Sequence, residues 1–361
     1  MKQEFVELLR CPRCWAHLEL TTFVETTTGG DEITDGVLRC GCGASYPIVD
    51  SIPRVLEGAY SQFPAFVERY RSLLNDISEE TEIPTGRFER MQAETKRSFG
   101  YQWTTFSEMA TDFKENFWNY LYPATPEFFE GKVGLDVGCG FGRHIYHAAS
   151  CGTTMVGVDF SSAIESTYAN TKHLPNVHLV QADIYAMPFQ PSTFDFAYSV
   201  GVLHHLPDPS SGLQGLLPLI KPGGTGFIWV YSSARRFTNA VLEGVRVMTS
   251  KMPPKLVKAL SFVGAVVDRY GFVLPYHVLR QVPGLKAIVE RLTPARIKLY
   301  HQYPFQVLYA DWFDRLAAPI RFYYSKSGTE ELMQTAGFVD VHVTATGFYG
   351  WRGRGIRPRD L

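Results

Sequence analysis

The stretch that decides the fold is VGLDVGCGFG, residues 133–142. An apolar run that ends in closely spaced glycines predicts a buried strand, followed by an abrupt turn into a helix. Glycine permits both the turn and the close approach of a ligand to the backbone, because it has no side chain to clash. Such a turn is also typical of dinucleotide-binding enzymes, so the residues outside it must identify the ligand.

Four further apolar runs follow this stretch, with helix-like segments between them, at residues 154–158, 177–180, 194–200 and 226–230. This alternation predicts a parallel sheet with helices on both faces, an α/β fold. Residues 233–325 break the pattern and indicate helices with proline-marked joints. A helix over 329–336, capped by Thr329, and a strand over 338–343 then return to the sheet.

Carboxylates occupy the ends of these predicted strands. Asp159 closes the second strand, where it can accept hydrogen bonds from both ribose hydroxyls of an adenosine. Asp183 follows the third strand and can accept from an adenine amino group. Asp136 precedes the glycines, where a carboxylate would repel the pyrophosphate of a dinucleotide. Each aspartate alone is compatible with an ordinary turn or cap, but the order of all four features indicates S-adenosylmethionine (SAM).

The same order resembles the class I SAM-dependent methyltransferases, and more closely the branch that includes the ubiquinone and menaquinone methyltransferases. The resemblance covers about residues 133–232 and 327–346, and includes MPF at 187–189, VLHHL at 202–206 and LIKPGG at 219–224. It implies a Rossmann-like sheet, methyl transfer with S-adenosylhomocysteine as the product, and a set of cofactor-binding residues. That set is Asp136, Gly138, Cys139, Gly140, Asp159, Phe160, Asp183, Ile184 and Val200, of which Cys139 is also expected to pack inside the turn.

Four cysteines lie before residue 43, in the pairs Cys11/Cys14 and Cys40/Cys42. Two tight turns of this kind can place four thiolates around Zn²⁺, with residues 26–35 forming a hairpin tip between the pairs. The alternative is four unrelated thiols. The segment resembles the small zinc-ribbon proteins that activate tRNA and protein methyltransferases as separate subunits, here fused to the enzyme. Its second pair has one intervening residue where two are usual.

The composition limits the partners and the compartment. The chain has 361 residues, with 35 basic and 36 acidic side chains, so no overall positive field attracts nucleic acid. We expect no signal peptide and no membrane span. Clustered cysteines fit a metal site in a reducing cytoplasm better than disulfides. The oligomeric state is open, with a homodimer as one alternative.

These observations divide the chain into five parts: a zinc ribbon (1–57), a helical connector or lid (58–130), a SAM-binding core (131–232), a helical substrate cap (233–325) and the end of the core (326–361). Residues 99–103 of the connector either fold over SAM or pack in a core. The basic tail 351–359 is expected to be a solvated end.

The acceptor is the least determined part of the prediction. Methyl transfer needs alignment, plus a base if the acceptor loses a proton. His205, and after it His204, are the candidates, with structural packing as the alternative; weaker candidates are Tyr323, Tyr324, His277 and His301. The neutral charge and aromatic-rich insertion favour a small-molecule acceptor, modified on O, N or C. An RNA methyltransferase that grips RNA with its ribbon, and a non-catalytic SAM-binding protein, are the alternatives.

Overall fold

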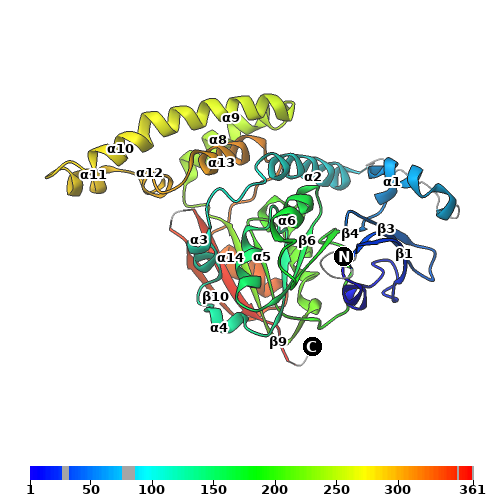
Figure 1. Cartoon of the computed structure of the whole chain (residues 1–361). Helices are drawn as coiled ribbons and strands as arrows, with labels where there is room; N and C mark the ends of the chain where they lie inside the picture. The colour runs from blue at the N-terminus through cyan, green and yellow to red at the C-terminus, as the bar shows by residue number, and fades with distance from the viewer. Residues whose placement is uncertain (27–31, 75–85, 348, 360–361) are drawn as a thin grey trace.

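The computed structural model describes residues 1–26, 32–74, 86–347 and 349–359. In this part of the chain an eleven-stranded sheet runs through the molecule in the order β1-β2-β3-β4-β7-β6-β5-β8-β9-β11-β10 (Figure 1). The strands are β1 (Glu19–Thr26), β2 (Glu32–Arg39), β3 (Ser45–Val49), β4 (Ile52–Val55), β5 (Val133–Val137), β6 (Thr154–Asp159), β7 (Val177–Ala182), β8 (Phe194–Val200), β9 (Ile220–Tyr231), β10 (Val339–Ala345) and β11 (Gly350–Ile356).

Strands β5 to β9 pair in parallel and form the centre of this sheet. Alternate side chains enter two hydrophobic clusters, one on each face, as expected for parallel strands buried on both sides. One face packs against α3 (Lys114–Leu121), α4 (Pro126–Phe129) and α5 (Arg143–Ser150). The other packs against α7 (Pro209–Gln214) and α14 (Lys326–Thr335). The predicted Rossmann-like α/β fold is therefore confirmed.

The N-terminal cysteine unit is joined to this core through the sheet itself. Its strands β1 to β4 pair antiparallel, and β4 then pairs in parallel with β7 at Arg54↔Gln181 and Val55↔Ala182. The Arg54 side chain is fully buried at this junction. It donates hydrogen bonds to Gln181 and to the Val49 carbonyl, and it forms an ion pair with Glu165 at 2.7 Å. The ribbon is thus a continuation of the cofactor-binding sheet.

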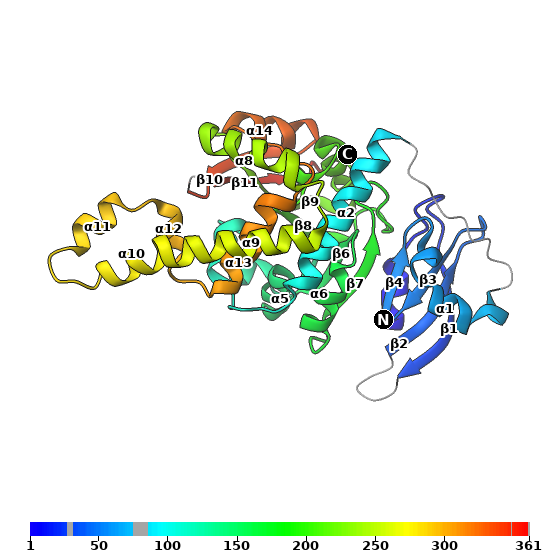
Figure 2. The same ribbon diagram turned by 90° about the horizontal axis from the view of Figure 1, so that it is seen from above.

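The remaining helices lie in the connector and in the insertion. The connector contributes α1 (Pro64–Arg69) and α2 (Arg87–Thr105), and α2 packs against α6 (Ala163–Thr171). The insertion consists of α8 (Arg236–Thr249), α9 (Pro254–Asp268), α10 (Leu274–Leu279), α11 (Lys286–Leu292), α12 (Ala295–Tyr300) and α13 (Phe305–Ala317). Figures 1 and 2 show these helices as a layer beyond one edge of the core, with α10 and α11 projecting past it.

Three sequence-based expectations differ from the structure. Helix α14 begins at Lys326, and Ser325 caps it by accepting from the Gly328 N–H, so Thr329 lies inside the helix. The tail is not a solvated end, because β11 pairs with both β9 and β10 and Arg357 is buried. The hairpin of β1 and β2 is present, but its strand β2 already starts at Glu32; residues 27–31 lie outside the described part of the chain.

Candidate functional site

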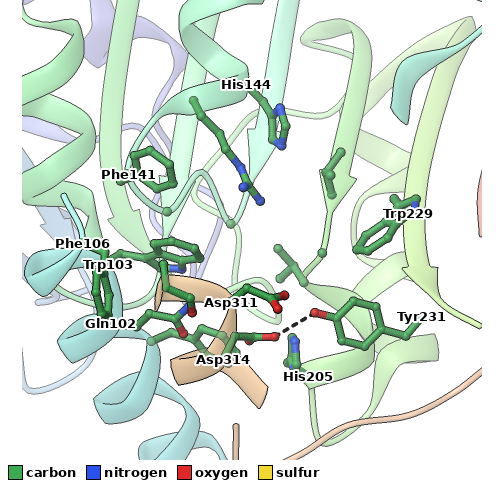
Figure 3. A pocket seen from close by; sticks show the side chains of 18 of the residues that line it. Gln102, Trp103, Phe106, Phe141, His144, His205, Trp229, Tyr231, Asp311 and Asp314 are labelled. Carbon is green, nitrogen blue, oxygen red and sulfur yellow. Dashed lines mark hydrogen bonds between the residues drawn. The ribbon is translucent and has the colours of Figure 1, made fainter. Parts of the chain in front are cut away.

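A cavity of about 820 Å³ lies at the carboxyl ends of the parallel strands, between the core, α2 and the insertion. Eight of the nine predicted cofactor residues line it; only Asp136 does not. Figure 3 shows how side chains from these three parts of the chain point into one space. The topology therefore brings together segments that are more than two hundred residues apart in the sequence, such as α2 and α13.

The glycine turn has the backbone geometry that its sequence predicts. Gly138, Gly140 and Gly142 have φ values of 79°, 59° and 89°, a region that other residues rarely adopt. A Cβ atom on Gly138 would lie 2.3 Å from a methyl group of Val202, so this position also requires glycine sterically. The Gly138 N–H donates to the Val158 carbonyl at 2.7 Å, which holds the turn against β6.

Two carboxylates lie beside this turn at the ends of β6 and β7. Asp159 accepts hydrogen bonds from the Gly140 N–H at 3.0 Å and from the N–H and hydroxyl of Ser161. Asp183 accepts from the Tyr185 N–H at 3.0 Å. Burial raises the pKa of both carboxyls, and hydrogen bonds oppose this effect. Both side chains line the cavity, where they present the acceptors expected for a ribose and an adenine.

Helix α2 covers this half of the cavity and supplies two polar residues that the sequence analysis missed. Gln92 donates to Asp183 at 2.5 Å. Lys96 lies over the Phe160 ring, 4.6 Å from its centroid. Burial lowers the pKa of Lys96 to about 8, although Asp183 and Asp159 oppose the shift. Trp103 of the same helix also lines the cavity, a position compatible with the lid role that is one of the two expected for residues 99–103.

Asp136 lies behind the cavity wall. Its side chain is buried next to Tyr198, and its Oδ2 atom has no hydrogen-bond partner among the described residues. Burial raises the pKa of this carboxyl to about 8. Cys139 lines the cavity and also packs in the core, where its sulfur accepts from the Thr167 hydroxyl at 3.5 Å.

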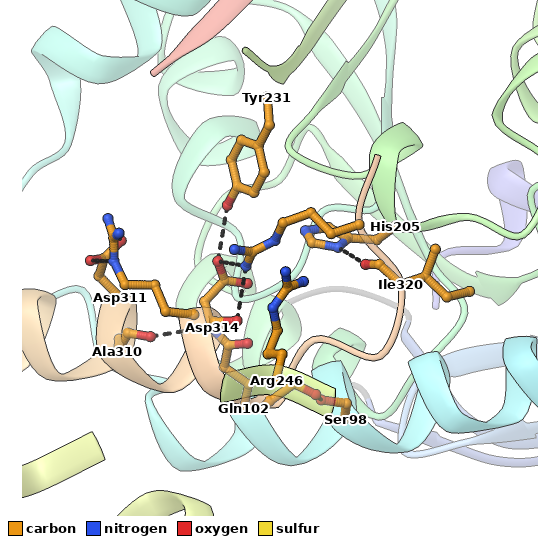
Figure 4. Close-up of polar contacts among 12 residues, drawn as sticks. Ser98, Gln102, His205, Tyr231, Arg246, Ala310, Asp311, Asp314 and Ile320 are labelled. Atoms are coloured by element: carbon orange, nitrogen blue, oxygen red, sulfur yellow. Dashed lines mark hydrogen bonds and ion pairs between the residues drawn. The ribbon is translucent and has the colours of Figure 1, made fainter. Parts of the chain in front are cut away.

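The two adjacent histidines occupy different environments. His205 lines the cavity, and its Nδ1 atom lies 2.7 Å from the Ile320 carbonyl oxygen (Figure 4). The carbonyl can only accept, so Nδ1 carries the proton and Nε2 has a free lone pair. His204 is fully buried and is not among the residues that line the cavity. Its ring packs against the Tyr231 ring, with 3.9 Å between the two ring centroids. The geometry therefore selects His205 as the candidate base.

A polar network from the insertion forms the wall opposite the glycine turn. The Tyr231 hydroxyl donates to Asp314 at 2.9 Å, and Arg321 pairs with the same carboxylate at 2.9 Å. On α13, the helix that carries Asp314, the side chain of Arg315 pairs with Asp311 at 2.6 Å. Both aspartates line the cavity, and Figure 3 shows them on its side where His205 and Tyr231 lie; Figure 4 shows the contact of Asp314 with Tyr231. These groups give the cavity a strongly polar end that could orient an acceptor.

Helix α2 and Phe106, the residue that follows it, contact helix α13 directly. The Ser98 hydroxyl donates to the Ala317 carbonyl at 3.1 Å, and the Phe106 ring contacts the Tyr309 ring edge-on at 4.9 Å between centroids. Of the weaker acceptor-site candidates, Tyr323 lines the cavity. The others, which are Tyr324, His277 and His301, are not among its lining residues.

The four N-terminal cysteines converge on one point. The sulfur atoms of Cys11, Cys14, Cys40 and Cys42 all lie within 4.8 Å of one another, and no disulfide joins them. Four thiols at this spacing suit tetrahedral Zn²⁺, so the single intervening residue of the second pair does not prevent convergence. Cys151 is a half-buried thiol that packs against the core.

Buried histidines make the stability depend on pH. Burial lowers the pKa of both His205 and His178 to about 4. In the unfolded chain a histidine titrates near pH 6.5, so the unfolded state binds more protons between about pH 6.5 and pH 4. We therefore expect the contribution of these two histidines to the free energy of unfolding to decrease as the pH falls through this window, while the raised pKa of Asp136 contributes with the opposite sign. Urea titrations at both ends of the window would measure it, and a His178→Gln, His205→Gln variant should show a weaker dependence.

The fold and the site define a class of domain: a Rossmann-like α/β sheet with a glycine turn and carboxylates at consecutive strand ends. Residues 135–228 match the family model described as Methyltransferase domain. This segment is accordingly a class I, SAM-type methyltransferase domain.

Two curated relatives each match about a third of the chain. This chain is 34% identical over 122 residues to the tRNA U34 carboxymethyltransferase of Pseudoalteromonas translucida. The match covers 33% of this chain and 36% of that protein. This chain is 32% identical over 119 residues to the ubiquinone biosynthesis O-methyltransferase of Albidiferax ferrireducens, a match that covers 32% of this chain and 44% of that protein. The chain thus spans less than half the length of these relatives.

Similar solved structures include the 1,6-didemethyltoxoflavin-N1-methyltransferase of Burkholderia thailandensis, with 14% identity, a TM-score of 0.44, and coverage of 78% of this chain and 94% of that one. Another is the complex of the Haloferax volcanii methyltransferase activator with a methyltransferase, with 12% identity, a TM-score of 0.42, and coverage of 72% and 97%.

Proposed function

We propose that the protein transfers a methyl group from SAM to a small-molecule acceptor held between the core, α2 and the insertion. The observation that carries this proposal is the shared cavity, which extends from the glycine turn to the polar wall of α13. Its two ends suit two different ligands. The methyltransferase-domain match of residues 135–228 supports SAM at the first end.

The cofactor-binding residues are those that line the first end. Asp159 and Asp183 would accept hydrogen bonds from the adenosine, while Ile184, Phe160 and Val200 supply apolar contacts. Asp136 supports the turn from behind, because it is buried and does not line the cavity. SAM supplies an electrophilic methyl group on its sulfonium, and the protein's own contribution is to position the acceptor and to exclude water.

His205 would take the acceptor's proton at Nε2 where the acceptor is an O–H or N–H group. Its hydrogen bond to the Ile320 carbonyl keeps the ring oriented and fixes the tautomer. Its pKa of about 4 keeps the ring neutral at physiological pH, so the lone pair is available. The Asp314–Tyr231–Arg321 contacts next to it would orient polar groups of the acceptor.

A small molecule suits this site better than RNA, because connector and insertion helices border the cavity together and the lining combines aromatic rings with polar side chains. The RNA alternative draws support from the tRNA-modifying relative, which matches one third of the chain. A methyl-release assay with labelled SAM against a small-molecule library and total tRNA would separate the two. Incorporation into tRNA alone would reject the small-molecule proposal.

Replacing Asp159 with alanine is expected to weaken SAM or S-adenosylhomocysteine binding about 10- to 150-fold. This factor corresponds to roughly 1.5–3 kcal/mol, the usual contribution of a hydrogen bond to a charged acceptor. Calorimetry measures this directly. Asp195→Asn is the matched control, because Asp195 accepts from the Val133 N–H at 2.9 Å and lies outside the cavity lining. Unchanged affinity in Asp159→Ala would remove this residue from the cofactor site.

A further inference from the structure

The insertion contains an arm, residues 251–292, whose outer surface is unusually apolar. It comprises α9, a π-helical turn (Arg269–Val273), α10 and α11. Figure 2 shows the arm running across the molecule and beyond the core at its far end. Large exposed apolar side chains continue along its whole length. A monomer rarely leaves so much contiguous apolar surface in water unless that surface binds something.

Helix α9 shows that this exposure is a patterned feature. Its inner face buries Val257, Ser261 and Ala265 against α13. A second stripe at helical spacing faces away from the core, formed by Leu256, Leu260, Val263 and Val267 with exposed fractions of 40–60%. The helix is therefore apolar on two sides, although among the described residues it packs through one of them.

The charges of the arm are almost all positive. Residues 251–292 contain seven Lys or Arg and two Asp or Glu. Both acids have an ion-pair partner: the buried Asp268 pairs with Arg296, and the partly exposed Glu290 pairs with Arg280. Four exposed basic side chains of the arm have no acidic partner among the described residues: Lys251, Lys255, Lys286 and Arg291. The first two lie at the start of the arm and the last two near its end, so the arm carries unpaired positive charge at both ends.

We propose that the outer face of the arm docks the protein on the surface of an anionic lipid bilayer. An apolar stripe bordered by unpaired lysines and arginines is the pattern by which interfacial helices insert shallowly and attract acidic headgroups. Among the described residues no helix is long and apolar enough to cross a membrane.

Two other occupants fit this surface less well. A second copy of the chain would bring two positive arms together, and lysine is depleted at the centres of protein interfaces. RNA would be attracted by the charges, but the α9 stripe itself is aliphatic and offers no ring for stacking on bases; the exposed aromatic rings of the arm, Phe262, Tyr270 and Phe272, lie outside the stripe. An anionic membrane surface is complementary both to the aliphatic stripe and to the positive charge.

Flotation of the full-length protein with lipid vesicles tests the proposal. We expect binding to vesicles of phosphatidylcholine mixed with phosphatidylglycerol, and little binding to phosphatidylcholine alone. Leu260→Glu with Val263→Glu, and separately Lys251→Glu with Lys255→Glu, should each weaken binding by about tenfold or more. Leu73→Glu is the matched control, since Leu73 is equally exposed but lies in the connector, and it should bind like the parent protein.

Thermal unfolding of each variant establishes that the fold is retained, because all substituted side chains are exposed. Light scattering and binding of fluorescent tRNA complete the test. Absence of binding to the anionic vesicles at low salt would overturn the proposal. Two further results would overturn the proposal if vesicle binding is unaffected by the same substitutions. One is a dimer that Leu260→Glu with Val263→Glu converts to monomers. The other is tRNA binding that is lost in the lysine variants.

Discussion

Replacing His205 with glutamine is expected to lower kcat by about 10²- to 10⁴-fold for any acceptor that must lose a proton, the usual contribution of a positioned base. Glutamine can still donate a hydrogen bond to the Ile320 carbonyl, so the local structure should be retained while the proton acceptor is lost. Turnover of labelled SAM with the acceptor found by screening measures the effect. Binding of S-adenosylhomocysteine should remain nearly unchanged.

His204→Phe is the matched control for this experiment. The ring of His204 packs on Tyr231, and both ring nitrogens lack hydrogen-bond partners among the described residues. An aromatic replacement should therefore keep kcat within a few-fold. The parent enzyme should lose activity as the pH falls through about 4, where His205 becomes protonated. Equal kcat values for His205→Gln and the parent protein would show that His205 does not act as a base.

Removing the metal is expected to unfold the N-terminal ribbon. We predict one Zn²⁺ per chain, bound by Cys11, Cys14, Cys40 and Cys42. Structural zinc contributes an apparent binding free energy of about 10–16 kcal/mol in small domains, which is comparable to the whole stability of a typical domain. A Cys11→Ser, Cys40→Ser variant should therefore lose both the metal and amide-exchange protection in β1 to β4. Elemental analysis and hydrogen exchange measure the two effects.

The consequence should reach the cofactor site, because β4 pairs directly with β7 and Asp183 follows that strand. We expect weaker S-adenosylhomocysteine binding in the metal-free protein, and increased exchange at Gln181 and Ala182. Cys151→Ser is the control, since this thiol lies outside the cysteine cluster and should leave the metal content unchanged. Protein purified without chelator that contains no metal would contradict the zinc site.

The local patterns of the sequence were sufficient for the core of the fold. The glycine turn, the apolar runs and the acidic strand ends each depend on neighbouring residues, so they predict strands β5 to β9 and the cavity edge correctly. Strand β11 was missed, because its residues are rich in glycine and arginine; pairing with β9 and β10 on either side stabilises it in spite of this composition. The sequence analysis therefore assigns Arg352 and Arg354 to a charged tail.

Residues of α2 illustrate a signal that was present but not used. Gln92, Lys96, Phe99 and Trp103 recur at helical spacing and all line the cavity. This periodicity predicts a common helix face, but no local rule indicates that the face packs over the ends of β6 and β7. Asp314 and Arg321 lie near the C-terminal end of the insertion and belong to no recognisable sequence motif. Their approach to His205 depends on how α13 packs.

The sequence by itself determined the class of sheet, the glycine turn, the strand-end carboxylates and the two closely spaced cysteine pairs of the candidate metal site, because these follow from backbone conformation and short-range spacing. Only the tertiary structure decided that His205 and not His204 lines the cavity, that β4 extends the sheet through β7, and that the outer stripe of α9 is left exposed by the described part of the chain. Each of these depends on long-range packing, in which elements distant in the sequence compete for the same buried surface.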